Sequence, residues 1–188
     1  MGIFKKFSSL FSTTNKPGGA RILCVGLDNS GKSTIINYLK PKKAAAAEVV
    51  PTVGFTVDTF SKNGITFTVF DMSGQGRYRN LWEHYYKEVA GIIFCIDSTD
   101  KIRMCVAKDE LESLLSNLVG KGIPILFFAN KMDLPTAATP VDCVQQLELD
   151  KIGDKPWHIA ASNALSGEGI EEGITWLGEQ MAKQQKKG

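Results

Sequence analysis

One glycine-rich loop constrains the fold of this 188-residue chain more than any other feature. The apolar run 22–25 is followed by a loop that begins at Gly26 and ends with Gly31-Lys32-Ser33, and then by the helical-looking segment 34–40. The pattern G-x-x-x-x-G-K-[ST] between a strand and a helix is typical of a phosphate-binding loop. Its glycines let backbone N–H groups turn toward an anion, and the helix N-terminus adds positive charge. A plain glycine turn that happens to contain Lys-Ser is the alternative, and the flanking strand and helix make it the weaker one.

This loop predicts the phosphate end of a nucleotide site. Lys32 is placed to reach the β- and γ-phosphates, and the Ser33 hydroxyl is placed to coordinate Mg²⁺. The other loop residues that we expect to line the phosphates are Asp28, Asn29, Ser30, Gly31 and Thr34.

Composition and charge exclude several other classes of protein. The chain is 43% hydrophobic and 22% charged, which are globular values, so wholesale disorder is excluded. A formal net charge of +2 is too balanced for a broad nucleic-acid surface, and we expect no nucleic-acid partner. No apolar stretch approaches the roughly 20 residues of a membrane span. The four cysteines have no C-x-x-C spacing, which predicts reduced thiols in a cytosolic protein: Cys24, Cys95, Cys105 and Cys143.

Short β-branched and aromatic runs alternate with amphipathic segments along the chain, and this alternation predicts an α/β fold. Asn63-Gly64 favours a type I′ hairpin turn, so the strands on either side of it should be antiparallel neighbours. The apolar runs further along the chain indicate strands buried on both faces of a parallel sheet. We therefore expect a six-stranded mixed sheet flanked by five helices. The expected strands are 21–27, 55–60, 65–70, 91–97, 124–129 and 157–160, and the expected helices are 32–40, 77–88, 101–118, 139–147 and 168–184.

Two further motifs point to the γ-phosphate and to hydrolysis. Thr52, in Pro51-Thr52-Val53-Gly54, can offer a hydroxyl to Mg²⁺ and a backbone N–H to a γ-phosphate. Asp71, at the end of an apolar strand, can hold Mg²⁺ through a bound water. Gly74 lacks a Cβ and can bring its N–H close to the γ-phosphate, and Gln75 can orient a hydrolytic water as the catalytic residue.

Two motifs after later strands predict recognition of guanine. The carboxylate of Asp133 can accept from the N1–H and the 2-amino group of guanine, neither of which adenine offers. Lys131 can lay its aliphatic stem over the base, and Asn130 can tie this segment to the phosphate loop. A backbone N–H after the last strand can meet the guanine O6, and the residues expected there are Ser162, Asn163 and Ala164. All of these motifs follow predicted strands, where open α/β sheets bind ligands.

Two other classes of function compete with a GTP-hydrolysing switch. Small-molecule kinases and ATP-driven motors also use a phosphate loop, but they have no use for Asn-Lys-x-Asp. A non-hydrolysing binding scaffold is the other alternative, and Gln75 and Thr52 argue against it. Because no arginine is committed to the transition state in cis, a slow enzyme that acts as a timer is the better interpretation.

The motifs at 26–33 and 51–55, together with Leu81-Trp82-x-His84-Tyr85-Tyr86, resemble the Arf and Arf-like small GTPases from about residue 20 to residue 180. The resemblance implies the small-GTPase P-loop fold, with bound GTP or GDP and Mg²⁺. It also implies two switch segments, about 46–55 and 73–88, which rearrange when the γ-phosphate is lost. Hydrolysis would be slow without a GTPase-activating protein, and a guanine-nucleotide exchange factor would reload the site.

Within that family, the runs 70–88, 125–133 and 154–159 resemble the subfamily that recruits the BBSome coat complex to membranes for ciliary traffic. Ser73 supports this subfamily, whereas Phe70 replaces the usual tryptophan between the switches. The implied location is cytoplasmic and peripheral to membranes, at the cilium and basal body. The alternative is an Arf-like GTPase that recruits a different effector in general vesicle or membrane traffic.

The chain divides into three parts on this interpretation. Residues 1–16 form an amphipathic segment with large apolar residues at helical spacing and lysines beside them, which suits an anionic membrane surface. A helix packed permanently on the domain is the alternative for that segment. Residues 17–184 form the GTPase domain, and residues 185–188 form a basic tail.

Overall fold

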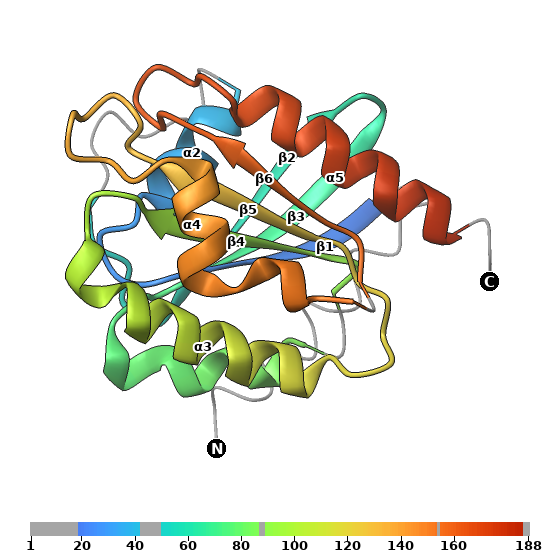
Figure 1. Cartoon of the computed structure of the whole chain (residues 1–188). Coiled ribbons are helices and arrows are strands. Elements are labelled where there is room, and N and C mark those ends of the chain that lie inside the picture. The colour runs from blue at the N-terminus through green and yellow to red at the C-terminus, as the bar shows by residue number, and fades with distance from the viewer. Residues whose placement is uncertain (1–18, 42–49, 87–88, 154, 186–188) are drawn as a thin grey trace.

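The computed structural model describes residues 19–41, 50–86, 89–153 and 155–185. Six strands form one sheet in the order β2-β3-β1-β4-β5-β6, with helices packed on both of its faces (Figure 1). The β2–β3 pair is antiparallel and the other neighbouring strands are parallel. The strands are β1 (Gly19–Val25), β2 (Phe55–Lys62), β3 (Ile65–Met72), β4 (Gly91–Asp97), β5 (Ile125–Asn130) and β6 (Trp157–Ala161).

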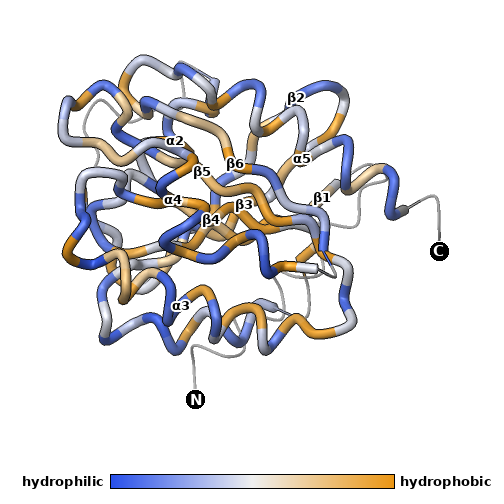
Figure 2. Tube along the Cα trace, viewed as in Figure 1, coloured by the Kyte–Doolittle hydropathy of each residue, from blue (hydrophilic) through white to orange (hydrophobic). Residues whose placement is uncertain are grey.

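The sheet separates two apolar layers. Buried residues of α3 (Met104–Asn117), α4 (Pro140–Leu147) and the 3₁₀ helix η1 (Gly76–His84) pack on one face. Those of α2 (Lys32–Leu39) and α5 (Ile170–Gln185) pack on the other. Figure 2 shows the hydrophobic residues concentrated along the central strands. Because these strands are covered on both faces, apolar residues fill successive positions in β4 and β5, as the sequence predicted.

The hairpin is formed by the turn that its residues favour. Asn63 and Gly64 both have positive φ, 50° and 77°, and they join β2 to β3. The ladder runs from Phe55–Met72 to Lys62–Ile65, so both strands extend two residues beyond their predicted ends. The Asn63 amide also donates to the Thr175 hydroxyl of α5 at 3.2 Å, which fixes the tip of the hairpin against that helix.

The predicted helices differ from the observed ones mainly in winding. The segment predicted as helix 77–88 is the 3₁₀ helix η1 as far as His84, and residues 87–88 lie outside the described part. Apolar residues spaced three or four apart fit either winding over so short a segment. The helix predicted over 101–118 consists of η2 (Lys101–Arg103) followed by α3, and η3 (Leu149–Lys151) follows α4.

The segment 1–16 and residues 186–188 of the tail lie outside the described residues, as do residues 46–49 of the first switch segment. In the part of the chain that the structure describes, no helix combines the length and the apolar character that crossing a membrane requires.

Candidate functional site

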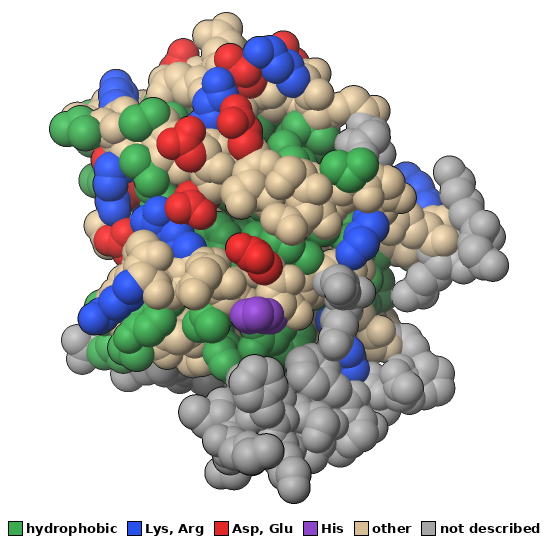
Figure 3. All heavy atoms as spheres, turned by 90° about the horizontal axis from the view of Figure 1, so that it is seen from below, with side chains coloured by type: hydrophobic (Ala, Val, Ile, Leu, Met, Phe, Trp, Pro, Cys, Tyr) green, Lys and Arg blue, Asp and Glu red, His purple; other side chains and the backbone are tan. Residues whose placement is uncertain are grey.

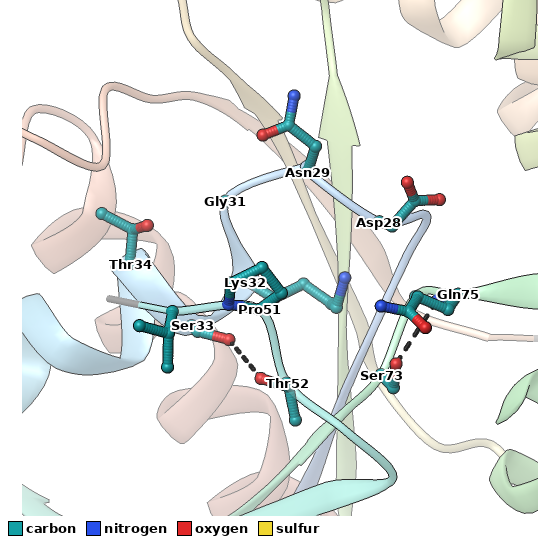
Figure 4. Close-up of a pocket in the computed structure, with 12 residues that line it drawn as sticks. Asp28, Asn29, Gly31, Lys32, Ser33, Thr34, Pro51, Thr52, Ser73 and Gln75 are labelled. Carbon is teal, nitrogen blue, oxygen red and sulfur yellow. Dashed lines mark hydrogen bonds between the residues drawn. The ribbon is translucent and has the colours of Figure 1, made fainter. Parts of the chain in front are cut away.

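An open cavity of about 280 Å³ lies over the phosphate loop (Figure 4). Three segments meet there: the loop with the first turn of α2, the residues before β2, and the residues after β3. The lining includes nine of the residues that the sequence predicted for the site. The lining residues are Asp28, Asn29, Gly31, Lys32, Ser33, Thr34, Val50, Pro51, Thr52, Ser73, Gly74 and Gln75.

The phosphate loop curls around its own lysine. The Lys32 ammonium donates to the Leu27 carbonyl oxygen at 2.7 Å and to the Ser30 hydroxyl at 3.4 Å, and Lys32 is only 5% exposed. Gly31 caps α2 with a φ of 92°, and a Cβ at this position would lie 2.2 Å from the Asn130 amide nitrogen. The loop therefore needs glycine at this point, and its cation is already in place at the N-terminal end of α2.

Three oxygen-bearing side chains lie at the corner where the sequence predicted Mg²⁺. The hydroxyls of Ser33 and Thr52 are 2.9 Å apart, and a dashed line in Figure 4 marks the hydrogen bond between them. Asp71 is 1% exposed, and its Oδ1 atom has no hydrogen-bond partner among the described residues. Burial raises the pKa of this carboxyl group, while the Ser33 hydroxyl and the Lys32 ammonium act in the opposite direction. Hydroxyl and carboxylate oxygens suit Mg²⁺, and a metal-bound water would satisfy the orphaned Oδ1 atom. These residues fit the ion.

The residues after β3 border the cavity on the side where the sequence predicted the γ-phosphate. A Cβ on Gly74 would lie 2.2 Å from both the Asp28 backbone nitrogen and the Leu27 carbonyl carbon, so this backbone is packed directly on the phosphate loop. The Gln75 side chain borders the cavity, and its carbonyl oxygen accepts from Arg77 Nε at 3.2 Å and Nη2 at 3.0 Å. Because Arg77 is exposed, this contact leaves Gln75 at the edge of the site.

Asn130 joins the two ends of the predicted nucleotide site. Its buried amide donates to the Ser30 carbonyl oxygen at 2.9 Å and accepts from the Ala164 N–H at 3.0 Å and from the Ser162 hydroxyl at 3.3 Å. One side chain thereby links the phosphate loop, the end of β5 and the loop after β6. The Met132 N–H adds a second link by donating to the Ser162 carbonyl oxygen at 3.1 Å.

The predicted base-binding residues extend from this junction. Lys131 has a φ of 67°, and its ammonium lies 2.6 Å from the Asp97 carboxylate. Although partial burial alone would raise the pKa of Asp97, hydrogen bonds from Lys131 and Thr99 hold that pKa below its ordinary value. Asp133 is exposed, and Asn163 follows Ser162 in the neighbouring loop.

Several residues at the site were not singled out by the sequence patterns. Asp97 holds Lys131, and it pairs in register with Asn130 on the neighbouring strand. Because β4 and β5 are adjacent buried strands, the sequence could have suggested that their last residues lie side by side. Arg103 donates to the Asp28 carboxylate at 2.8 Å and to the Asp28 carbonyl oxygen at 3.3 Å, and its own Nε atom lies 2.6 Å from Asp100. No local signal links Arg103 to a loop 75 residues earlier in the chain.

The cysteines are free thiols, as their spacing predicted. Cys24, Cys95 and Cys143 are buried and Cys105 is exposed. Cys95 lies beneath the phosphate loop, where its thiol donates to the Ser30 carbonyl oxygen at 3.0 Å, and burial raises its pKa to about 12. The thiol therefore acts as a neutral packing group under the loop.

The chain is similar to known proteins over nearly its whole length. The model of the ADP-ribosylation factor family matches residues 4–181. A Danio rerio relative named ADP-ribosylation factor-like protein 6 is 56% identical over 183 residues, which are 96% of this chain and 97% of that protein. A Caenorhabditis elegans relative of the same name is 42% identical over 185 residues, 97% of this chain and 96% of that protein.

A solved structure has the same fold. It is described as the Arl6 BBS3 small GTPase from Trypanosoma brucei with bound nucleotide analogue GppNp, and it is 45% identical to this chain. The two structures superimpose with a TM-score of 0.81, over 88% of this chain and 99% of the other. With the family model matched over nearly its whole length, this chain is a GTP-hydrolysing enzyme that belongs to the ADP-ribosylation factor (Arf) family of small GTPases.

Proposed function

We propose that this chain, in its GTP form, binds membranes and recruits the BBSome coat complex for the traffic of ciliary membrane proteins. The observation that carries the proposal is the 56% identity to a protein named ADP-ribosylation factor-like protein 6, over nearly the full length of both chains. On this proposal the protein works in the cytoplasm and at membranes of the cilium and basal body. An exchange factor would load it with GTP, and a GTPase-activating protein would return it to the GDP form by accelerating hydrolysis.

In the phosphate half of the site, the loop 28–34 holds the phosphates and Lys32 neutralises the β- and γ-phosphates. Ser33 and Thr52 would bind Mg²⁺ directly and Asp71 through a water, which fits the paired hydroxyls and the orphaned carboxylate oxygen. Bound Mg²⁺ supplies neutralisation of charge on the β- and γ-phosphate oxygens. Gln75 would orient the attacking water once its amide leaves the exposed Arg77.

In the base half of the site, Asp133 would accept the two guanine N–H donors, and Lys131 would cover the ring with its stem. The Asp97 contact holds Lys131 at its ammonium end, so the stem is the part left for the base. An adenine would leave the Asp133 carboxylate without donors, which costs far more than a lost methylene contact.

The effector surface lies beside the γ-phosphate half of the site. Val50 is 69% exposed, Val53 is 68% exposed and Val57, on the edge strand β2, is 38% exposed. Thr52, between the first two of these valines, lies 2.9 Å from the Ser33 hydroxyl. Because Thr52 and this apolar patch belong to one short segment, a partner that binds the valines would also detect whether the γ-phosphate is present.

The test compares two loaded forms of the protein in extract from ciliated cells. We expect BBSome subunits on beads that carry the GTPγS form and none on beads that carry the GDP form. A Val53→Asp variant should lose the coat but bind nucleotide normally, because its side chain points to solvent. Enrichment of a different coat by the GTPγS form would favour the alternative, an Arf-like GTPase of general vesicle traffic.

Membrane binding is tested separately, because residues 1–16 supply the proposed contact. Full-length protein loaded with GTPγS should co-sediment with vesicles that contain anionic lipid. A chain that begins at residue 17 should stay in solution while it still binds nucleotide, and sedimentation of that shortened chain would contradict the assignment.

A further inference from the structure

We propose that two side chains of η1, the Trp82 indole and the Arg79 guanidinium, are positioning residues for the γ-phosphate. They hold the carbonyl groups of two successive peptide units between Ser73 and Gln75, and so orient the N–H groups on the other side of those units. The inference rests on the proposed function at one point, namely that the Gly74 N–H contacts the γ-phosphate.

The first peptide unit is held by tryptophan. The Trp82 Nε1–H group donates to the Ser73 carbonyl oxygen at 3.2 Å, and the whole residue is 1% exposed. A trans peptide is planar, and its C=O and N–H groups point in opposite directions. The carbonyl group of Ser73 and the N–H group of Gly74 belong to the same unit. A buried indole that fixes the carbonyl therefore also fixes the direction of the Gly74 N–H.

The second peptide unit is held by arginine. Arg79 Nε donates to the Gly74 carbonyl oxygen at 2.8 Å. This carbonyl shares its plane with the N–H of Gln75, which lies 3.4 Å from the Ser73 hydroxyl oxygen. The guanidinium thereby sets the backbone direction from which the Gln75 side chain leaves.

Arg79 is itself held from the opposite side by another element. Its Nη1 atom lies 2.7 Å from Glu110 Oε1 on α3, and its side chain is 14% exposed. Its Nη2 atom lies 3.9 Å from Asp28 Oδ1 of the phosphate loop. One rigid fork therefore connects the switch backbone, α3 and the phosphate loop, which a lysine with a single charged head cannot do. Figure 3 shows acidic and basic side chains interspersed on the face of the molecule seen from below.

The packing of Gly74 makes the orientation critical. Its backbone lies so close to Leu27 and Asp28 that even a methyl group would meet them at 2.2 Å. A rotation of either peptide unit would change the direction of its N–H group or push its carbonyl group toward the loop. GDP has no γ-phosphate, so this orientation matters only for GTP.

The experiment measures GTPγS and GDP affinities of the full-length protein by calorimetry, with Mg²⁺ present. Trp82→Phe removes the indole donor and keeps an aromatic ring, and Arg79→Lys keeps the charge and removes the fork. We expect each variant to bind GTPγS about five- to tenfold more weakly, the range of one lost hydrogen bond, with GDP affinity unchanged. Glu110→Gln should also weaken GTPγS binding, but by a smaller factor. Trp157→Phe is the matched control, since that ring packs on Phe127 away from the site, and it should change neither affinity.

The outcomes separate the two proposals. If Trp82→Phe and Arg79→Lys leave the ratio of GTPγS to GDP affinity at the wild-type value, the positioning role is wrong. If the wild-type protein binds neither nucleotide, the proposed function itself fails. Thermal unfolding of the GDP-loaded variants reports whether each one folds. Should the cavity left by Trp82→Phe prevent folding, the ratio measured for Arg79→Lys decides the question.

Discussion

The amide of Asn130 offers the sharpest test of how the site is built. Asn130→Ala removes the donor to the Ser30 carbonyl oxygen and the oxygen that accepts from the Ala164 N–H. The Ser162 hydroxyl loses the same acceptor but can still donate to the Ala129 carbonyl oxygen at 3.5 Å. Leaving a buried polar group without a partner costs about 1–3 kcal/mol. Cys95 also donates to the Ser30 oxygen, so the cost there is at the low end. The two losses together come to about 2–4 kcal/mol, or roughly thirty- to several-hundredfold in an equilibrium constant.

The assay is the release of a fluorescent GDP analogue into excess unlabelled GDP with Mg²⁺ present. In the free protein the two loops can relax, so most of the cost should appear as faster release of nucleotide. Asn130→Asp keeps the acceptor for Ala164 but sets a carboxylate oxygen against the Ser30 carbonyl oxygen, so it should release nucleotide at least as fast as Asn130→Ala. Asn117→Ala, which removes an exposed contact at the end of α3, is the control. An unchanged release rate in Asn130→Ala, or wild-type behaviour in Asn130→Asp, would refute the reasoning.

Three other outcomes follow from the site. Gln75→Leu should slow single-turnover GTP hydrolysis at least about tenfold with GTP affinity retained, and an unchanged rate would remove Gln75 from the mechanism. Burial raises the pKa of Asp71, so the folded protein favours the protonated form of this carboxyl group. In metal-free protein the free energy of unfolding should therefore fall as pH rises through the folded pKa. Asp71→Asn should therefore raise the neutral-pH melting temperature in EDTA while it weakens Mg²⁺–GTP binding, and a lower melting temperature would contradict this. The pKa of Asp97 is lowered, so its stabilisation is present above the ordinary carboxyl pKa and is lost as pH falls through the folded value. In urea unfolding, Asp97→Asn should be less stable than wild type by about 1–3 kcal/mol at pH 7. This difference in the free energy of unfolding should become smaller toward pH 3, and a difference that stays constant with pH would contradict the prediction.

The fold was predictable because its signals are local. Asn63-Gly64 fixed the hairpin, and the continuous apolar runs of β4 and β5 fixed the buried parallel strands. The 3₁₀ winding of η1 was not predictable, since its side chains bond back to the carbonyls of Ser73 and Gly74 rather than following a helical pattern of their own.

The candidate site was predictable only as far as its motifs are contiguous. The phosphate loop and the Asn130–Asp133 segment are read directly from neighbouring residues. The Arg79–Glu110 and Arg103–Asp28 pairs join residues that are 31 and 75 positions apart, and a charged residue on a helix looks the same whether it is solvated or paired. Pairs of this kind depend on how the elements pack, which periodicity does not encode.

The place of the hairpin in the sheet restricts how it can move. It is joined to the other strands through a single parallel ladder between β3 and β1, whereas its own two strands are paired along their whole length. Any translation relative to β1 would therefore move β2 and β3 together as one rigid unit. A step of one residue would turn every buried side chain of β3 to the wrong face, so the smallest permitted step is two residues, about 6.6 Å. Asp71 lies opposite Cys24 in this ladder, so such a step would move its carboxylate away from the Ser33 hydroxyl all at once rather than by degrees.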